Sequence, residues 1–200
     1  IRHRPLNDDD LSITFDNAGE WELYFAVLLY TGLRAGDAAM LTYGNIDFSQ
    51  KVITTLVRKS RRVHEFPLSN HLVSLIPKSK DDNEPLFPTL YVTKTNSVGE
   101  IVADERILHY RIGIPRKRFQ MILKEADRPK ATLHSFRVTF NNLLFAEKLS
   151  IEDRQSLMAH SSSKTTTVYT HPNLELARDY INKLPNYSIG KKQNQNVTKT

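Results

Sequence analysis

Residues 20–34 read Glu-Trp-Glu-Leu-Tyr-Phe-Ala-Val-Leu-Leu-Tyr-Thr-Gly-Leu-Arg, and this stretch organises the first half of the chain. Its large apolar residues recur at helical spacing and predict a helix over Glu20 to Leu33 with one apolar stripe. The stripe consists of Trp21, Phe25, Leu28 and Leu29. Gly32 suits the end of this helix, because glycine readily adopts the left-handed backbone that closes many helices. Arg34 follows at a place suited to a rigidly held side chain, although the stretch alone favours an ordinary surface arginine.

The rest of the chain alternates helical and extended patterns. Asn7 followed by three aspartates predicts a helix start, because a capping side chain and acidic residues suit the positive end of a helix. The other predicted helices cover 36–41, 69–78, 103–128 with breaks at Gly113 and Pro115, 135–148, 151–160 and 173–184, with a short turn or helix at 164–170. Strands are predicted at 45–48, 51–58 and 62–68, and an irregular connection at 80–100. The predicted fold class is mainly α with a small antiparallel β-sheet, an α+β arrangement.

Positive charge is concentrated in two places. The net charge is +6 and the pI is about 9.5, which favours a polyanionic partner without proving one. Residues 58–62 place four cations at the turn between two predicted strands, which favours phosphate contact over a solvated turn that protects a sheet edge. Between residues 106 and 130, eight Lys and Arg residues stand against two acids, with Tyr110 and Phe119 among them. This second segment predicts sequence-independent phosphate affinity, with a solvated face as the alternative.

What the sequence lacks narrows the possible functions. It has no cysteine, which excludes disulfides, thiol catalysis and zinc sites built on thiolates. The longest apolar run, Leu23 to Tyr30, is far shorter than the roughly 18 residues of a membrane span, so no membrane partner is expected. Glycine loops for phosphates, HExxH, GxGxxG and serine nucleophile elbows are all missing. No histidine pair has metal-ligand spacing, and residues 8–10 are better explained as a helix cap than as a metal site, so neither metal nor cofactor is expected.

Two further stretches gather residue types that suit phosphate chemistry. Residues 133–137 read Leu-His-Ser-Phe-Arg and place His134 three positions before Arg137, near a predicted helix start that itself attracts anions. Residues 156–171 read Ser-Leu-Met-Ala-His-Ser-Ser-Ser-Lys-Thr-Thr-Thr-Val-Tyr-Thr-His, with Tyr169 nine positions after His160. Two arginines, two histidines and a tyrosine are the groups needed to attack a phosphodiester with a phenol oxygen.

In combination these motifs resemble those of the tyrosine recombinases, also called phage integrases, and in particular their Xer-like bacterial branch. Thr-Gly-Leu-Arg ending at Arg34 resembles the first arginine box of the family, with Asp37 at its usual acidic position. Residues 134–137 resemble the His-x-x-Arg box, and residues 167–171 resemble the nucleophile box. The resemblance covers about Leu6 to Leu184 and implies the catalytic-domain fold of this family.

Two positions depart from the family pattern or fit it less simply. Leu-Met-Ala-His at 157–160 has alanine where the family usually has glycine. Lys59 matches the lysine of the family's β-hairpin, but arginines crowd it on both sides. Residues 80–115 have no counterpart that we can align. No catalytic position is lost, so the resemblance implies an active enzyme with these catalytic residues: Arg34, Lys59, His134, Arg137, His160 and Tyr169.

The resemblance also implies the mechanism. Tyr169 attacks the scissile phosphate and forms a 3′-phosphotyrosine, while His134 accepts the phenol proton. Arg34 and Arg137 bind the non-bridging oxygens, because guanidinium groups match phosphate and stay charged. Lys59 protonates the leaving 5′-oxygen. His160 holds a phosphate oxygen or positions the tyrosine, and neither ATP nor metal is required.

Double-stranded DNA is therefore the expected partner. The residues predicted to bind it are Arg58, Arg61, Arg62, Arg116, Lys117 and Arg118. Residues 1–5 are expected to be a linker from an N-terminal DNA-binding domain, 6–184 the catalytic domain, and 185–200 a polar tail. The family implies a homotetramer on DNA for the full-length protein, in the bacterial cytoplasm or nucleoid.

Three alternatives stay open at this point. A type IB topoisomerase uses similar chemistry to relax supercoils, although the Xer-like spacing of the motifs argues against it. A non-catalytic DNA-binding module could keep the fold, although the complete residue set argues against that. A metal-dependent nuclease built on the aspartates at 8–10 or 81–82 is a weaker third reading.

Overall fold

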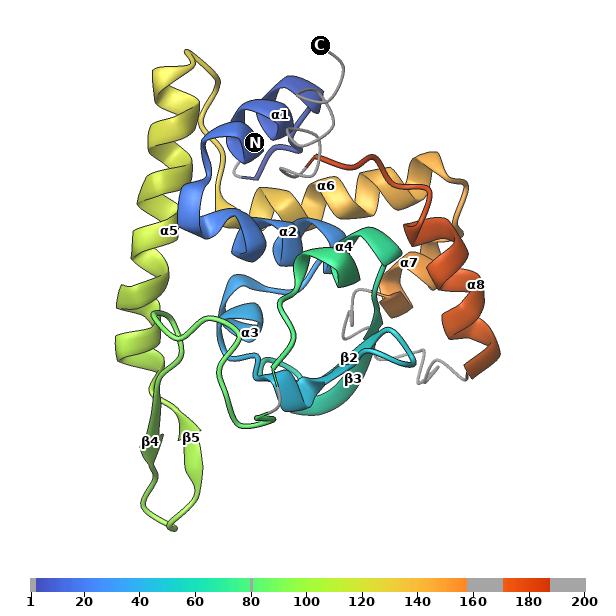
Figure 1. Ribbon diagram of the computed structural model, residues 1–200. Coiled ribbons are helices and arrows are strands. Elements are labelled where there is room, and N and C mark those ends of the chain that lie inside the picture. The colour runs from blue at the N-terminus through green and yellow to red at the C-terminus, as the bar shows by residue number, and fades with distance from the viewer. Residues whose placement is uncertain (1–2, 80, 158–170, 188–200) are drawn as a thin grey trace, which may run out of the picture.

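The computed structural model describes residues 3–79, 81–157 and 171–187, which form a helical body with two small antiparallel sheets (Figure 1). The α-helices are α1 (Asp8–Asn17), α2 (Glu22–Thr31), α3 (Ala35–Ala39), α4 (Asn70–Leu75), α5 (Glu105–Glu125), α6 (Leu133–Ala146), α7 (Ile151–Leu157) and α8 (His171–Ile181). The strands are β1 (Ile46–Asp47), β2 (Val52–Val57), β3 (Arg62–Pro67), β4 (Thr93–Thr95) and β5 (Ile101–Ala103). Two 3-10 turns are η1 (Gly19–Trp21) and η2 (Tyr43–Asn45). The predicted fold class is confirmed.

Helix α2 forms the centre of the core. Every residue from Tyr24 to Thr31 is buried, because α2 packs against α3, α4 and α6. Three phenylalanine rings meet beside it, Phe25 of α2, Phe119 of α5 and Phe136 of α6. The ring centroid of Phe25 lies 5.8 Å from that of Phe119 and 5.4 Å from that of Phe136, and those of Phe119 and Phe136 lie 5.0 Å apart. The helix is thus buried on all sides, whereas the sequence predicted one apolar stripe, because tertiary packing covers its second face as well.

The sheet β1-β2-β3 is antiparallel throughout, and each of its three strands begins and ends within one residue of the predicted bounds. Ile53 pairs with Phe66 at the buried end of the β2–β3 hairpin, and Leu56 pairs with Val63 near its exposed tip. Helix α3 packs on β2 and α8 packs on β3. The turn at residues 58–61 lies at the other end of the hairpin from the buried Ile53–Phe66 pair.

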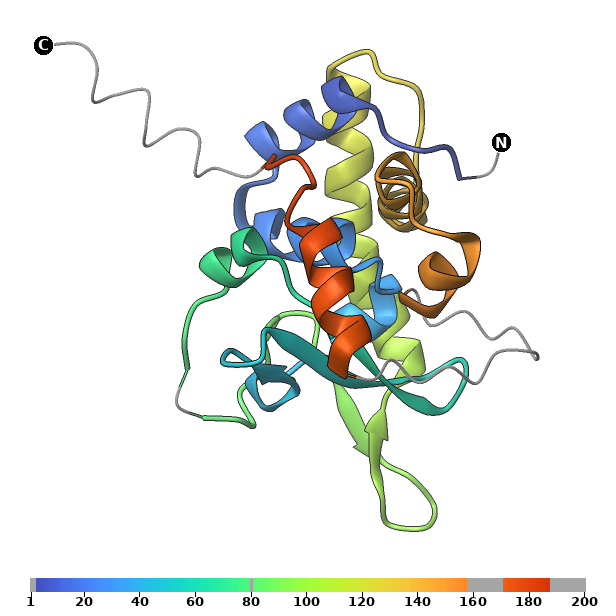
Figure 2. The same cartoon turned by 90° about the vertical axis from the view of Figure 1, so that its right-hand side faces the viewer.

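Residues 80–100, predicted to be irregular, contain part of a second hairpin. Strand β4 pairs with β5 in antiparallel register, and this hairpin projects beyond the body in both views (Figures 1 and 2). Asn96 closes its turn by accepting hydrogen bonds from the backbone N–H groups of Val98 (3.0 Å) and Glu100 (2.9 Å). The sequence pattern missed these strands because they bury little surface and so carry no alternation of apolar and polar residues.

Helix α5 runs without a break through Gly113 and Pro115, so the predicted interruption is wrong. Proline removes one intrahelical hydrogen bond and costs about 3 kcal/mol in a helix interior, and glycine costs about 1 kcal/mol. The helix persists because it buries a long apolar stripe, which includes Pro115 itself, against the core. The buried residues of this stripe are Leu108, Ile112, Pro115, Phe119, Ile122 and Leu123.

The segment before α1 is tied to the loop between α5 and α6. Asp10 is fully buried and accepts hydrogen bonds from Arg4 Nη1 (2.5 Å), Arg128 Nε (2.9 Å) and the backbone N–H of Asn7 (3.1 Å). Arg4 also donates to the carbonyl of Lys130 (3.2 Å). Residues 3–5 therefore pack on the body of the protein, although the sequence assigns them to a linker.

The folded part also extends past the predicted boundary at Leu184. The hydroxyl of Tyr30 donates to the carbonyl of Pro185 (2.8 Å) and accepts the backbone N–H of Tyr187 (2.9 Å). The Tyr187 ring stacks on Phe15 of α1, with 6.5 Å between the ring centroids. The first residues after α8 are thereby anchored to α1 and α2.

We expect Asp10→Asn to lower the free energy of unfolding by about 1–3 kcal/mol at neutral pH, because charge-assisted hydrogen bonds to two arginines are lost. Burial raises the pKa of the Asp10 carboxyl, but the hydrogen bonds from Arg4 and Arg128 outweigh it and lower the pKa below its usual value. This stabilisation is present above the pKa of unfolded aspartate, about 3.9, and is lost as the pH falls through the lower folded pKa.

Urea unfolding of both proteins at neutral pH and in acid measures the effect. The difference between wild type and Asp10→Asn should narrow in acid, and a difference that stays constant with pH would contradict the role assigned to the carboxylate.

Candidate active site

Two arginines converge beside the end of α2. Arg137 of α6 is 4% exposed, and its Nη1 donates a hydrogen bond to the carbonyl oxygen of Gly32. Gly32 has a left-handed backbone with φ of 64°, and a Cβ there would lie 2.5 Å from Phe140 Cδ1. Glycine is therefore required both for the turn and for the close approach of α6. Arg34 lies two residues further on, as the N-cap of α3, so one hydrogen bond joins the segments that carry both arginines.

The two arginines interact electrostatically. The pKa of the Arg137 guanidinium is lowered to about 10, first by burial and then by the positive charge of Arg34, while Asp37 acts in the opposite direction. Arg137 thus remains a cation at neutral pH. Asp37 is buried as well, and its Oδ2 accepts no hydrogen bond from the described residues. The paired cations form a preorganised place for an anion.

The β2–β3 hairpin is held against this pair of arginines by Arg58. Its Nε donates to Asp37 Oδ1 (3.1 Å), and its Nη1 donates to Glu105 Oε1 (2.8 Å) in the first turn of α5. A Cβ at Gly36 would lie 1.9 Å from Arg58 Nη2, so glycine at this position leaves the space that the guanidinium fills. Lys59 follows directly, so the turn that carries Lys59 is fixed to α3 and α5.

The ion pairs give Arg58 a structural role that the sequence did not indicate, and its contact with DNA stays a prediction. Lys59, Arg61 and Arg62 are exposed at the same turn. Within the described parts of the chain, none of these three forms an ion pair. The hairpin tip therefore combines one anchored arginine with three cations that face solvent.

The hydroxyl of Tyr24 marks the place where α3, the hairpin and α5 meet. It donates to the carbonyl of Ala35 (2.8 Å), the residue after Arg34. Burial raises the pKa of Tyr24, and the positive charges of Arg116 and Arg58 act in the opposite direction. Arg116 of α5 therefore lies within electrostatic reach of the same hydroxyl as Arg58. One of the three predicted DNA-binding cations of α5 is thus placed next to the candidate site.

His134 lies on α6 one turn before Arg137, as the second residue of the helix, and its side chain is exposed. Thr132 and Ser135 form a capping box, in which Thr132 N donates to Ser135 Oγ (3.2 Å). The imidazole lies against His3, with 4.7 Å between the ring centroids. An exposed imidazole next to a buried guanidinium can exchange a proton with a group that the guanidinium binds.

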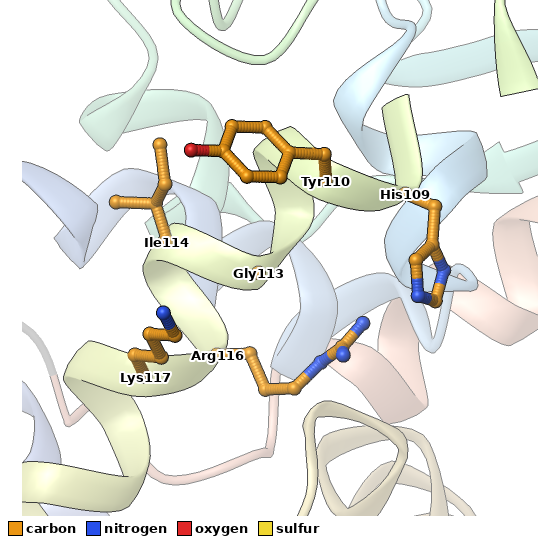
Figure 3. A pocket seen from close by; sticks show the side chains of 6 residues that line it. All are labelled: His109, Tyr110, Gly113, Ile114, Arg116 and Lys117. Atoms are coloured by element: carbon orange, nitrogen blue, oxygen red, sulfur yellow. The ribbon is translucent and has the colours of Figure 1, made fainter. Parts of the chain in front are cut away.

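A notch on the exposed side of α5 gathers further polar and apolar groups (Figure 3). Its volume is about 230 Å³, and it opens at Gly113, where a Cβ would meet nothing within 4 Å. The residues that line it are His109, Tyr110, Gly113, Ile114, Arg116 and Lys117. Arg118, on a different side of the helix, donates to the carbonyl of Asn17 (2.5 Å). Arg116 and Lys117 are thus placed at one surface feature, whereas Arg118 is used to tie α5 to α1.

The other two predicted catalytic residues, His160 and Tyr169, lie outside the described residues. The neighbouring described elements are α7, which ends at Leu157, and α8, which begins at His171. Helix α7 packs on α6, the helix of Arg137, and α8 packs on β3 of the hairpin. Among the described residues, no group of three or more His, Asp or Glu could hold a metal ion. In the same part of the chain, no helix is both long and apolar enough to cross a membrane.

The sequence profile of the phage integrase family matches residues 12–175 of this chain, which is most of its length. The chain belongs to the phage integrase family. The matched span includes the two arginines, the hairpin and the segment that holds Tyr169. The recognition made from the sequence motifs is therefore confirmed.

Curated relatives carry recombinase names. A probable integrase/recombinase of Acholeplasma phage L2 is 26% identical over 186 residues, which cover 93% of this chain and 58% of the relative. The tyrosine recombinase XerD of Neisseria meningitidis serogroup B is 27% identical over 149 residues, covering 72% of this chain and 48% of the relative. The chain spans about half the length of the curated relatives that it matches.

Solved structures show the same fold. The integrase of mycobacterium phage Brujita matches with a TM-score of 0.63 and 16% identity, over 91% of this chain and 58% of that one. The catalytic domain of bacteriophage HP1 integrase matches with a TM-score of 0.56 and 18% identity, over 98% of this chain and 95% of that one. The chain therefore has the fold of a catalytic domain of its family.

The sequence indicated the residues that carry the family motifs but not those that hold them in place. It did not indicate the link from Asp37 to Arg58, the space that Gly36 leaves, or the contact between His3 and His134. These contacts join residues far apart in the chain, so no local pattern reports them. One usable signal was present, because a glycine and an aspartate follow Arg34 within three positions.

We expect Arg58→Ala to lower the free energy of unfolding by about 1–3 kcal/mol, because it leaves the buried Asp37 carboxylate without its partner. Arg61→Ala, in the same turn, is the matched control and should stay within about 0.5 kcal/mol of wild type. Urea unfolding of the three proteins measures both values. Equal stability of the two variants would contradict the structural role of Arg58.

Proposed function

We propose that this protein is a site-specific DNA recombinase that cleaves and rejoins strands through a covalent 3′-phosphotyrosine. The observation that carries the proposal is the convergence of Arg34 and buried Arg137 at Gly32, beside the anchored turn of Lys59. Two guanidinium groups that stay charged suit a phosphodiester in which negative charge builds up on the non-bridging oxygens. Relatives named XerD, XerC and integrase support the same assignment.

In the proposed reaction, the oxygen of Tyr169 forms a bond to phosphorus as the bond from phosphorus to the 5′-oxygen breaks. His134 accepts the proton of the phenol. A tyrosine phenol ordinarily has a pKa of about 10, so it keeps its proton at neutral pH and needs an acceptor. Lys59 gives a proton to the leaving 5′-oxygen. Arg34 and Arg137 hold the non-bridging oxygens, and His160 supports the phosphate or the tyrosine. Reversal by another strand's 5′-hydroxyl completes strand exchange.

The proposed DNA face joins the hairpin tip to α5. Arg61 and Arg62 are exposed at the tip, and Arg116 and Lys117 line the notch of α5. The link from Arg58 to Glu105 holds these two elements together. Cations on both elements suit contacts with phosphates, and the notch suits a base edge or a methyl group between Tyr110 and Ile114. In this arrangement Arg58 and Arg118 hold the elements of the face in place through contacts within the protein, and the other cations contact the DNA.

The proposal for the whole protein goes further. Relatives longer than this chain support a second, N-terminal DNA-binding domain joined through residues 1–5. The resemblance to the family implies a homotetramer on two duplexes. The catalytic domain then consists of residues 6–184 together with the flanking residues that are anchored to it, 3–5 and 185–187, and the polar tail follows. The proposed site of action is the bacterial cytoplasm or nucleoid, where the DNA is. The reaction needs no metal or ATP, because the phosphotyrosine bond conserves the energy of the phosphodiester.

Tyr169→Phe should abolish covalent protein–DNA adducts, because phenylalanine has no oxygen that can attack phosphorus. The assay uses nicked suicide duplexes in EDTA, carrying Xer-like sites and a randomised pool, followed by denaturing gels. Tyr180→Phe, which removes a phenol oxygen from α8, is the matched control and should form adducts at the wild-type rate. Arg34→Ala should slow adduct formation at least about 100-fold.

An adduct that survives Tyr169→Phe would place the nucleophile elsewhere. A lack of adducts with every protein, including a longer form with the N-terminal domain, would favour a binding-only function. Relaxation of supercoiled plasmid without any dependence on paired sites would indicate a topoisomerase instead. Adducts that require a divalent metal would indicate a nuclease.

Lys117→Ala should weaken DNA binding and reduce the salt dependence of the affinity. Each lost phosphate contact lowers the slope of log affinity against log salt by about 0.9. Lys78→Ala removes an exposed lysine that lies outside the proposed face, and its slope should equal that of wild type. Fluorescence anisotropy with one duplex over a range of salt concentrations gives the slopes, and equal slopes for Lys117→Ala and wild type would remove α5 from the DNA face.

A further inference from the structure

We propose that His3, in the segment before α1, is a positioning residue for His134, an inference that rests on the proposed role of His134 as proton acceptor. The two imidazoles are in contact, with 4.7 Å between ring centroids and 55° between ring planes. His134 is exposed in the first turn of α6. His3 supplies a contact from another part of the chain.

The ring of His3 is itself held in place. Its Nδ1 is hydrogen-bonded to Thr132 Oγ1 at 2.8 Å. Thr132 is the N-cap of α6 and forms the capping box with Ser135, so the hydroxyl that holds His3 belongs to a residue that is itself fixed at the helix start. His3 is thereby fixed to the cap of the same helix whose second residue is His134.

The backbone around His3 is anchored on the same side of the molecule. Arg4 donates to the carbonyls of Pro129 (2.5 Å) and Lys130 (3.2 Å) and is ion-paired with buried Asp10. The backbone N–H of Leu6 donates to Thr139 Oγ1 of α6 (2.8 Å). Residues 3–6 therefore lie along the loop that enters α6 and along α6 itself, and they are held there by contacts that do not involve His134.

These contacts have a consequence for the reaction. A proton acceptor works only when its nitrogen is aimed at the proton, and small displacements of reacting groups reduce rates steeply. An imidazole in contact with a fixed ring already has fewer accessible orientations, so it loses less conformational entropy when DNA binds. His3 acts through His134 and not on the substrate, so it sets the rate of cleavage rather than the affinity for DNA.

The experiment compares His3→Ala with His3→Phe in the full chain. Aromatic contacts contribute about 0.5–1.5 kcal/mol, so His3→Ala should slow adduct formation on saturating nicked DNA by about 2- to 10-fold. The affinity for DNA should stay at the wild-type value. His3→Phe keeps a ring against His134 and should recover most of the rate. Asn142→Ala, on the exposed side of α6, is the matched control and should leave the rate unchanged.

A spectroscopic measurement separates positioning from general stabilisation. In wild type, a nuclear Overhauser effect should connect the ring protons of His3 and His134, and His3→Ala should shift the His134 imidazole resonances while Asn142→Ala does not. Absence of the Overhauser effect, or adducts that form equally fast with His3→Ala, would overturn this inference alone. A wild-type chain that forms no adducts would instead overturn the proposed function, and with it the reaction that His3 is inferred to serve.

Discussion

The hydrogen bond from Arg137 to the carbonyl of Gly32 is the interaction on which the rest of the site depends. A buried guanidinium costs free energy unless its donors are used, and the carbonyl at the end of α2 accepts from one of them. The same glycine allows α6 to approach, since Phe140 occupies the space that any Cβ would need. The most buried helix of the protein thus ends where the two arginines meet, and the position of Arg34 follows from that of the core.

Positive charge is concentrated around this contact, and the carboxylate of Asp37 offsets only part of it. Burial, and then repulsion from Arg34, lower the pKa of Arg137, and Asp37 offsets part of that effect while it holds Arg58. The aspartate therefore has two roles, because it steadies the arginine pair and anchors the turn that carries Lys59. Charged donors that the fold holds in place suit an anionic ligand, because they need not reorganise when it binds.

Contacts between residues that are distant in the sequence fix the relative positions of the elements that form the site. Arg58 joins the hairpin to α3 and α5, and Asp10 joins the segment before α1 to the loop that leads into α6. Helix α5 shows the same principle on a larger scale. Its local sequence, with Gly113 and Pro115, favours a break, but six buried residues on one face outweigh that preference. The β4–β5 hairpin is the opposite case, because strands that bury little leave no pattern in the sequence.

The sequence by itself determined the fold class, the central helix, the main hairpin, the family and the residues that carry its motifs. These features are encoded locally, as periodicity, turn residues and short motifs around Arg34, His134 and Arg137. Only the tertiary structure decided that α5 is continuous, that Arg58 is a structural link, and that His3 lies on His134. The physical reason is that burial and ion pairing depend on which surfaces meet, and residues that meet from distant parts of the chain, such as His3 and His134, leave no shared local signal.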